Sequence, residues 1–204
     1  MAVNLQKGQK VDLTKGNASL KKVMVGLGWD EVQKKSSGFL ASLLGNNSNY
    51  DIDCDASAIL ISENGKCTTS KDVVFYNNLQ HSSGAVIHQG DNLTGAGDGD
   101  DEQIKVYLQD VPSKYQRIVF TVTIYQAIER KQHFGMIKNA FIRIVDDDTK
   151  KELCRYNLSE DTAYNGKTAM IFGELYRYKN EWKFSAIGEA TNDGGIVQMA
   201  NRFM

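Results

Sequence analysis

The chain of 204 residues has little of several residue types that define common protein classes. It contains one proline and three cysteines, and its formal net charge is −1. The cysteines (Cys54, Cys67 and Cys154) are odd in number and widely spaced, which excludes a disulfide framework or a cysteine zinc site and predicts reduced thiols. Because the net charge is close to zero, the chain has no general attraction to nucleic acids, and no nucleic-acid partner is expected.

Long apolar segments are also missing. No apolar run approaches the roughly 20 residues that cross a bilayer, and the first residues, Met1 to Lys7, lack the apolar stretch of a signal peptide. We therefore expect a cytoplasmic protein. Hydrophobic residues make up 41% of the chain, which indicates a packed core and not disorder. The length suits one large all-β domain or two small ones.

Acidic and glycine residues are instead concentrated between Gly90 and Glu102. This segment contains five carboxylates, one carboxamide and four glycines, and it has no Lys or Arg. Two carboxylates about 5 Å apart repel each other by roughly 3 kcal/mol at an effective dielectric constant of about 20, so a compact loop of this composition needs a cation. Oxygen donors without His or Cys favour calcium over zinc. The alternative is an open, solvated loop without metal, and composition alone does not decide between the two.

A second acidic segment runs from Asp51 to Asp55 and leads into an apolar run that ends at Ile61. If this stretch is extended, Asp51, Asp53 and Asp55 lie on one face, because side chains alternate along a strand. Three acids on one face are unfavourable within a strand but suit a strand end beside a metal. The alternative is an acidic edge that prevents pairing between sheets. Two such segments together favour a shared cation site at one end of a β-sandwich.

Strand-like segments separated by turns recur along the chain, and they predict an all-β fold, a two-sheet β-sandwich with short peripheral helices. In one of them Val23, Val25, Leu27 and Trp29 share a face, and Asp30 follows at its end. The apolar alternation from 118 to 124 predicts a strand that is nearly buried. Short helices are expected over 39–44 and 195–203, and the only proline, Pro112, falls between two predicted strands.

Several other acidic, glycine-rich or histidine features have simpler interpretations. An EF-hand that began at Asp51 would have Ala56 and Ser62 at the positions that require Gly and Glu, which excludes it. The glycines between 95 and 99 lack the lysine of a phosphate-binding loop. His88 is expected on a strand surface, and the acids 146–148 are expected to be solvated at a hairpin tip.

Six segments, taken in order, resemble the TerD family of bacterial stress and tellurite-resistance proteins. They are Gly26-Leu-Gly-Trp-Asp30, Asp53-Cys-Asp-Ala-Ser-Ala58, Phe75-Tyr-Asn-Asn-Leu79, the Gly90–Glu102 loop, Ala140-Phe-Ile-Arg143 and Phe172-Gly-Glu-Leu-Tyr176. The resemblance covers essentially the whole chain, and the acidic loop is its most specific part. It implies one calcium-binding β-sandwich domain over residues 1–204, located inside the cell and without an established catalytic activity. The segment 31–50 is longer than in some relatives.

The expected function is therefore a calcium-binding stress-response protein that acts as a non-enzymatic scaffold or sensor. The candidate calcium ligands are Asp30, Asp53, Asp55, Asp91, Asn92, Gly95, Asp98, Asp100, Asp101 and Glu102. The expected partners are other stress-response proteins, with a calcium-dependent contact to the inner membrane surface as an alternative. A metal-assisted phosphate-ester hydrolase is the competing function. Neither acidic segment contains Lys, Arg or His to assist such chemistry, which favours the non-enzymatic interpretation.

Overall fold

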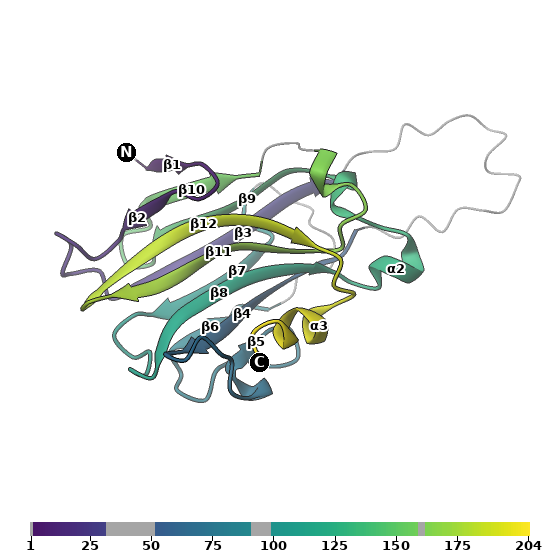
Figure 1. Cartoon of the computed structure of the whole chain (residues 1–204). Helices are drawn as coiled ribbons and strands as arrows, with labels where there is room; N and C mark the ends of the chain where they lie inside the picture. The colour runs from purple at the N-terminus through teal and green to yellow at the C-terminus, as the bar shows by residue number, and fades with distance from the viewer. Residues whose placement is uncertain (1, 32–51, 91–98, 159–161) are drawn as a thin grey trace, which may run out of the picture.

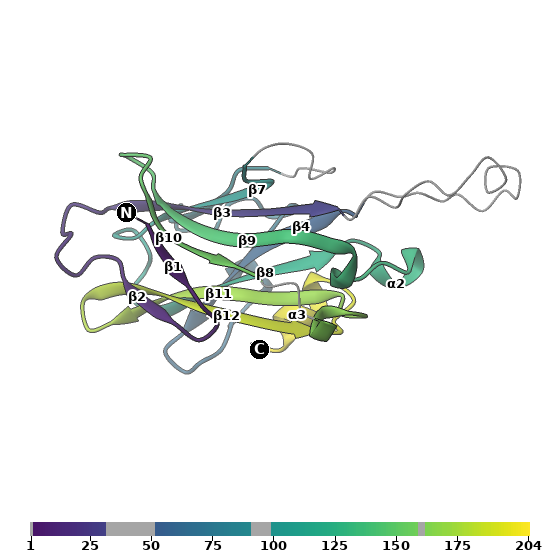
Figure 2. The ribbon, with the colours of Figure 1, turned by 90° about the horizontal axis from the view of Figure 1, so that it is seen from above.

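The computed structural model describes residues 2–31, 52–90, 99–158 and 162–204. These residues form two six-stranded sheets that pack face to face (Figures 1 and 2). In spatial order, the first sheet contains β1 (Val3–Leu5), β10 (Glu152–Asn157), β9 (Ile137–Asp146), β3 (Lys22–Glu31), β7 (Glu102–Tyr107) and β6 (Val86–His88). The second sheet contains β2 (Lys10–Asp12), β12 (Glu181–Thr191), β11 (Ala169–Tyr178), β8 (Tyr115–Ile124), β4 (Cys54–Ser62) and β5 (Val73–Val74).

Short helical segments lie at the ends of these strands. They are η2 (Ser70–Asp72), α2 (Ala127–Arg130), η3 (Phe134–Met136), η4 (Thr162–Tyr164) and α3 (Ile196–Asn201). The strand pairs within each sheet are antiparallel except for β1 and β10, which are parallel. The predicted two-sheet sandwich with peripheral helices is confirmed.

The alternation of apolar residues in β3 predicts which of its side chains enter the core. Val23, Val25 and Leu27 have no exposed surface, and Trp29 keeps 4%. These side chains pack between the sheets against residues of the second sheet such as Phe120. Burial of apolar area at about 25 cal/mol per Å² supplies the main stabilising contribution. The periodicity therefore fixes which face of β3 points inward, and so places Gly26, Gly28 and Asp30 on its outer face.

A second, smaller core explains why β8 is apolar on both faces. Ile118 and Phe120 belong to the main core between the sheets, whereas Val119 packs outside the second sheet. There it meets Met199 and Ala200 of α3, which are 0% and 4% exposed. The C-terminal helix predicted for 195–203 is thus confirmed, and its apolar stripe covers the outer face of the second sheet.

Some predicted segments differ in extent from the structure. The acidic strand predicted from Asp51 begins only at Cys54, so Asp53 precedes β4 and Asp55 lies inside it, while Asp51 falls outside the described residues. The helix predicted for 39–44 also falls outside them. Pro112 lies between β7 and β8, as predicted, and its carbonyl oxygen accepts a hydrogen bond from Tyr115 N at 2.9 Å.

Candidate metal centre

Two glycines of β3 make room for the acidic segment on the outer face of the first sheet. A Cβ at Gly26 would overlap the carboxylate of Asp100, and one at Gly28 would lie 2.7 Å from the carbonyl oxygen of Gly99. Neither glycine has a positive φ, so the close approach explains both of them. The alternation of Gly26 and Gly28 with Leu27 and Trp29 therefore seats residues 99–101 on the sheet while the larger side chains enter the core.

Asp100 is buried in an ion pair with Arg143 of β9. The Asp100 side chain has no exposed surface, and it accepts hydrogen bonds from Arg143 Nε at 2.7 Å and Nη2 at 3.0 Å. Gln103 Nε2 donates to the same carboxylate at 3.3 Å. The hydrogen bond to Asp100 raises the pKa of Arg143 above its ordinary value. Neither acidic segment contains a cation of its own, but the fold brings Arg143 of β9 to Asp100.

Asp101 lies in a crowd of carboxylates. Its Oδ2 accepts a hydrogen bond from Trp29 N at 2.7 Å, and its own N–H donates to Leu27 O at 2.8 Å. Burial raises the pKa of Asp101, the Trp29 hydrogen bond lowers it, and the charges of Asp30 and Asp100 raise it further, so the net shift is upward. Asp30 is exposed and accepts a hydrogen bond from Asn139 Nδ2 at 2.7 Å. Repulsion between these acids is what a bound cation would relieve.

Glu102 faces the interior and contacts a buried histidine. His88 Nε2 lies 2.8 Å from Glu102 Oε2, and both side chains are 1% exposed. The prediction that His88 lies on a strand surface is wrong, because His88 faces inward and Ile87 takes the outer side of β6. The same Nε2 atom is 3.2 Å from the carbonyl oxygen of Ala56 on β4. His88 therefore connects the start of β7 in one sheet to the start of β4 in the other.

This connection brings the described parts of the two acidic segments, residues 53–55 and 99–102, to the same end of the sandwich. Asp53 directly precedes β4, and its carbonyl accepts a hydrogen bond from Tyr125 N at 2.8 Å. Asp55 is 6% exposed and lies opposite Thr123 of β8. Strand alternation gives Asp55 the outer face of the second sheet, because Ala56 is in the core between the sheets.

The candidate ligands differ in how well they fit a calcium ion. Asp91, Asn92, Gly95 and Asp98 fall outside the described residues. Within the part of the chain that the structure describes, no group of three His, Cys, Asp or Glu side chains is arranged to hold a metal. Two of the described candidates, Asp100 and Glu102, already contact Arg143 and His88. Asp30 and Asp101 fit best, because carboxylate oxygens are hard donors, the charge of Asp30 repels that of Asp101, and Asp30 is exposed.

The acids at the β9–β10 turn form a different kind of cluster. Asp147 is 7% exposed and lies 2.6 Å from Lys150 Nζ, 3.6 Å from Lys105 Nζ and 3.9 Å from Lys22 Nζ. The hydrogen bond to Lys150 and the other two lysines lower the pKa of Asp147, although burial opposes them. The prediction that this whole turn is solvated is therefore wrong for Asp147, which anchors the turn through lysines.

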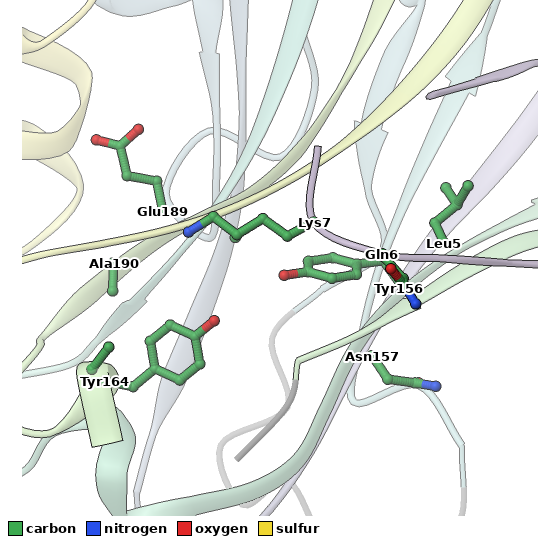
Figure 3. Close-up of a pocket in the computed structure, with 10 residues that line it drawn as sticks. Leu5, Gln6, Lys7, Tyr156, Asn157, Tyr164, Glu189 and Ala190 are labelled. Carbon is green, nitrogen blue, oxygen red and sulfur yellow. The ribbon is translucent and has the colours of Figure 1, made fainter. Parts of the chain in front are cut away.

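A cavity of about 540 Å³ lies between β1, β10, η4 and β12 (Figure 3). β1 and β10 form the edge of the first sheet that lies opposite β7 and β6. Tyr156 and Tyr164 line it, together with Lys7 and Glu189. Burial and the neighbouring Tyr164 raise the pKa of Tyr156 to about 12. Gly188 has φ +64°, and a Cβ there would overlap the Tyr156 hydroxyl, so glycine is required. Sequence patterns gave no signal for this cavity, because its walls come from four distant segments.

None of the helices within the described residues is long and apolar enough to cross a membrane. The TerD domain family model matches residues 1–203. The chain is 50% identical to stress response protein SCP2 of Bacillus subtilis (strain 168) over 204 residues, covering 100% of both chains. It is 47% identical to tellurium resistance protein TerD of Serratia marcescens over 203 residues, covering 100% of this chain and 97% of the relative.

The fold has solved counterparts as well. A homologue of telluride resistance protein (TerD) from Streptomyces coelicolor A3(2) superposes with a TM-score of 0.65 and 20% sequence identity, and the match covers 89% of this chain and 95% of that one. This likeness shows the shared sandwich, and the sequence relatives show the family. The features that first indicated the relationship, Gly26 and Gly28 of β3 and the acidic segment that they seat, lie together in the structure. The chain belongs to the TerD family.

Proposed function

We propose that this chain is a calcium-binding stress-response protein of the tellurite or chemical-stress resistance type, and that it acts as a non-enzymatic scaffold or sensor. Relatives that match it are named for stress response, for tellurium resistance and for resistance to chemical-damaging agents. The observation that carries the calcium proposal is the position of Asp101 beside Asp30 and Asp100. Burial raises the pKa of Asp101, and the charges of these two neighbours raise it further. Carboxylates that repel one another at a loop are the donors that calcium prefers.

The ion would be held by Asp30 at the end of β3 and by Asp101 just before β7. Asp53, which directly precedes β4, would join them only after a rearrangement, because the described residues bring no three such side chains together. Asp91, Asn92, Gly95 and Asp98 belong to the same proposal but lie outside the described residues. Calcium, when bound, supplies the positive charge that neutralises these carboxylates. The protein's own residues would hold the acids in position. Arg143 pairs with Asp100, and His88 contacts both Glu102 and the Ala56 carbonyl oxygen of β4.

A hydrolase would need a positive group free to bind a phosphoryl oxygen, and Arg143 is the cation that pairs with Asp100. Its Nε and Nη2 donate to Asp100, and its Nη1 donates to Glu152 at 3.1 Å. A guanidinium whose three nitrogens all donate to carboxylates has its charge compensated and its strongest donor directions occupied. This geometry supports the non-enzymatic proposal over the metal-assisted hydrolase.

Exposed apolar side chains near the same end would suit a partner. Tyr125 follows β8, and its backbone N–H donates a hydrogen bond to the carbonyl oxygen of Asp53. Tyr125 is 38% exposed. Ile128 on α2 and Val197 on α3 are 67% and 68% exposed. In Figure 1, α2 lies at the end of the sandwich where β8 ends, whereas α3 covers the outer face of the second sheet. The two helices approach each other before α3, where a Cβ at Gly194 would lie 3.4 Å from Ile128 Cδ1. Another stress-response protein is the proposed occupant, in the cytoplasm, and the membrane surface is the alternative that the test below distinguishes.

Calorimetry on protein stripped of metal tests the calcium proposal. We expect saturable calcium heat that Asp101→Asn weakens by about tenfold or more, because one charged ligand is lost. Asp110→Asn is the matched control, since Asp110 is an exposed aspartate in the turn between β7 and β8. No calcium heat in the parent protein, or equal losses in both variants, would contradict the proposal.

The scaffold role is tested separately with Ile128→Ser and Val197→Ser. If a protein partner is captured only with calcium, and both variants lose it while a phosphatase and esterase screen stays negative, the proposal holds. Calcium-dependent flotation with anionic vesicles that both variants lose would show a membrane partner. Turnover that disappears with Asp101→Asn in a folded protein would establish the hydrolase.

A further inference from the structure

Arg177 of β11 lies at the end of the sandwich opposite the acidic segments, where the β11–β12 hairpin turns (Figures 1 and 2). It lines a cavity of about 320 Å³. The polar side chains around that cavity are Thr14, Gln109, Asn180 and Glu181, and Trp182 forms one wall. Three separate segments of the chain therefore meet around one guanidinium.

The guanidinium is held in place by neutral groups. Arg177 Nε donates to Tyr115 O at 3.2 Å, and Nη2 donates to Val111 O at 2.7 Å. The Cζ atom lies 4.4 Å from the ring centroid of Trp182, whose Nε1 is fixed by a hydrogen bond to Leu108 O at 3.1 Å. A guanidinium has five N–H groups, so these two bonds leave donors for a ligand while the stacking fixes their plane.

This arginine differs from its neighbours in charge compensation. Arg117, Arg143, Arg155 and Arg202 each form an ion pair with a carboxylate. Within the described residues, no carboxylate lies within ion-pair distance of Arg177. Burial lowers the pKa of Arg177, and no acidic group acts to raise it. A half-buried, oriented cation without a counter-charge is stabilised by an anion that enters the adjoining cavity.

We propose that this cavity binds a phosphate group, free or at the end of a small phosphomonoester, through the Arg177 guanidinium and the side-chain amides of Gln109 and Asn180. Arginine donates parallel hydrogen bonds to two oxygens of such an oxyanion, and the amides can donate to a third. Glu181 lines the same cavity and opposes an anion, which limits the affinity. This site is separate from the proposed calcium site and does not depend on it.

The test uses Trp182 as the reporter. The chain has two tryptophans, so the Trp29→Phe variant leaves Trp182 alone beneath Arg177. Its fluorescence is titrated with inorganic phosphate against chloride at equal ionic strength, and glycerol phosphate in a second arm separates a phosphomonoester from free phosphate. We expect a saturable phosphate signal. Arg177→Lys should weaken it about tenfold, because lysine lacks the planar pair of donors, and Glu181→Gln should tighten it about threefold by removing repulsion.

Arg117→Lys is the control, since Arg117 pairs with Glu174 on the same sheet and does not line the cavity. If Arg177→Lys does not fold, Asn180→Ala and Glu181→Gln still decide the matter, because both residues lie at the hairpin turn and should weaken and tighten binding respectively. A phosphate signal that does not saturate, that chloride reproduces, or that Glu181→Gln leaves unchanged would overturn the site.

Discussion

Replacing Arg143 by methionine would show how far the fold depends on the ion pair beneath the acidic segment. Asp100 has no exposed side-chain surface, and Arg143 donates two of the three side-chain hydrogen bonds described for its carboxylate. Breaking one side of a buried ion pair costs about 3–5 kcal/mol, because the other charge stays buried. The Arg143 side chain is 26% exposed, which places the expected loss near the lower value. For a chain of this length, that corresponds to a melting temperature lower by roughly 6–12 °C.

Thermal unfolding followed by circular dichroism, in chelator, measures this loss. Arg117→Met is the control, because Arg117 is 39% exposed and donates one hydrogen bond to Glu174, so its loss should be about 1 kcal/mol or less. Adding Asp100→Asn to Arg143→Met should restore part of the stability by removing the stranded charge. The reasoning is refuted if Arg143→Met melts with the control, or if the double variant is no more stable than the single one.

The remaining predictions concern the metal, acid unfolding and the thiols. Asp53→Asn and Asp101→Asn should each weaken calcium binding, with non-additive effects in calorimetry if they share one ion, and additive effects would indicate separate sites. Burial alone would raise the pKa of Asp72, but hydrogen bonds, above all from Tyr115, lower it. The stability from Asp72 is therefore present above its unfolded pKa of about 4 and is lost as pH falls through the folded value. Tyr115→Phe should move the acid-unfolding midpoint to higher pH, and an unchanged midpoint would contradict this. Burial raises the pKa of Cys154 to about 12, so a thiol reagent at pH 8 should label it only as fast as the protein unfolds, and labelling at the denatured rate would exclude this.

The strands could be predicted because their information is local. Val23, Val25, Leu27 and Trp29 recur with a period of two, and their burial follows from that period. The apolar residues of β8 also predicted a strand that is nearly buried. The sequence did not show that α3 supplies the second cover, since a helix far along the chain gives no local signal at β8.

The candidate site was less predictable, because its partners come from distant segments. Arg143 and Asp100 are 43 positions apart in sequence, and they meet only after β9 and β7 pair with β3. His88 was assigned to the surface because one residue of strand register decides which face it occupies, and a three-residue strand gives too little alternation to fix that register. Composition pointed to the acids as candidate ligands but could not show which of them already had a partner.

The described acids now divide into two groups with different physical roles. Asp100 and Glu102 are buried and compensated by Arg143 and His88, so replacing those contacts with a cation would first require breaking them. The negative charges of Asp30 and Asp101 repel each other, and the pKa of Asp101 is raised. A cation bound between them would relieve this repulsion without breaking an ion pair among the described residues. Because Asp101 lies between Asp100 and Glu102 in the chain, the pairs that those two residues form hold the backbone of Asp101 in place. A calcium site built on the crowded acids and supported by the compensated ones therefore requires the least rearrangement of this fold.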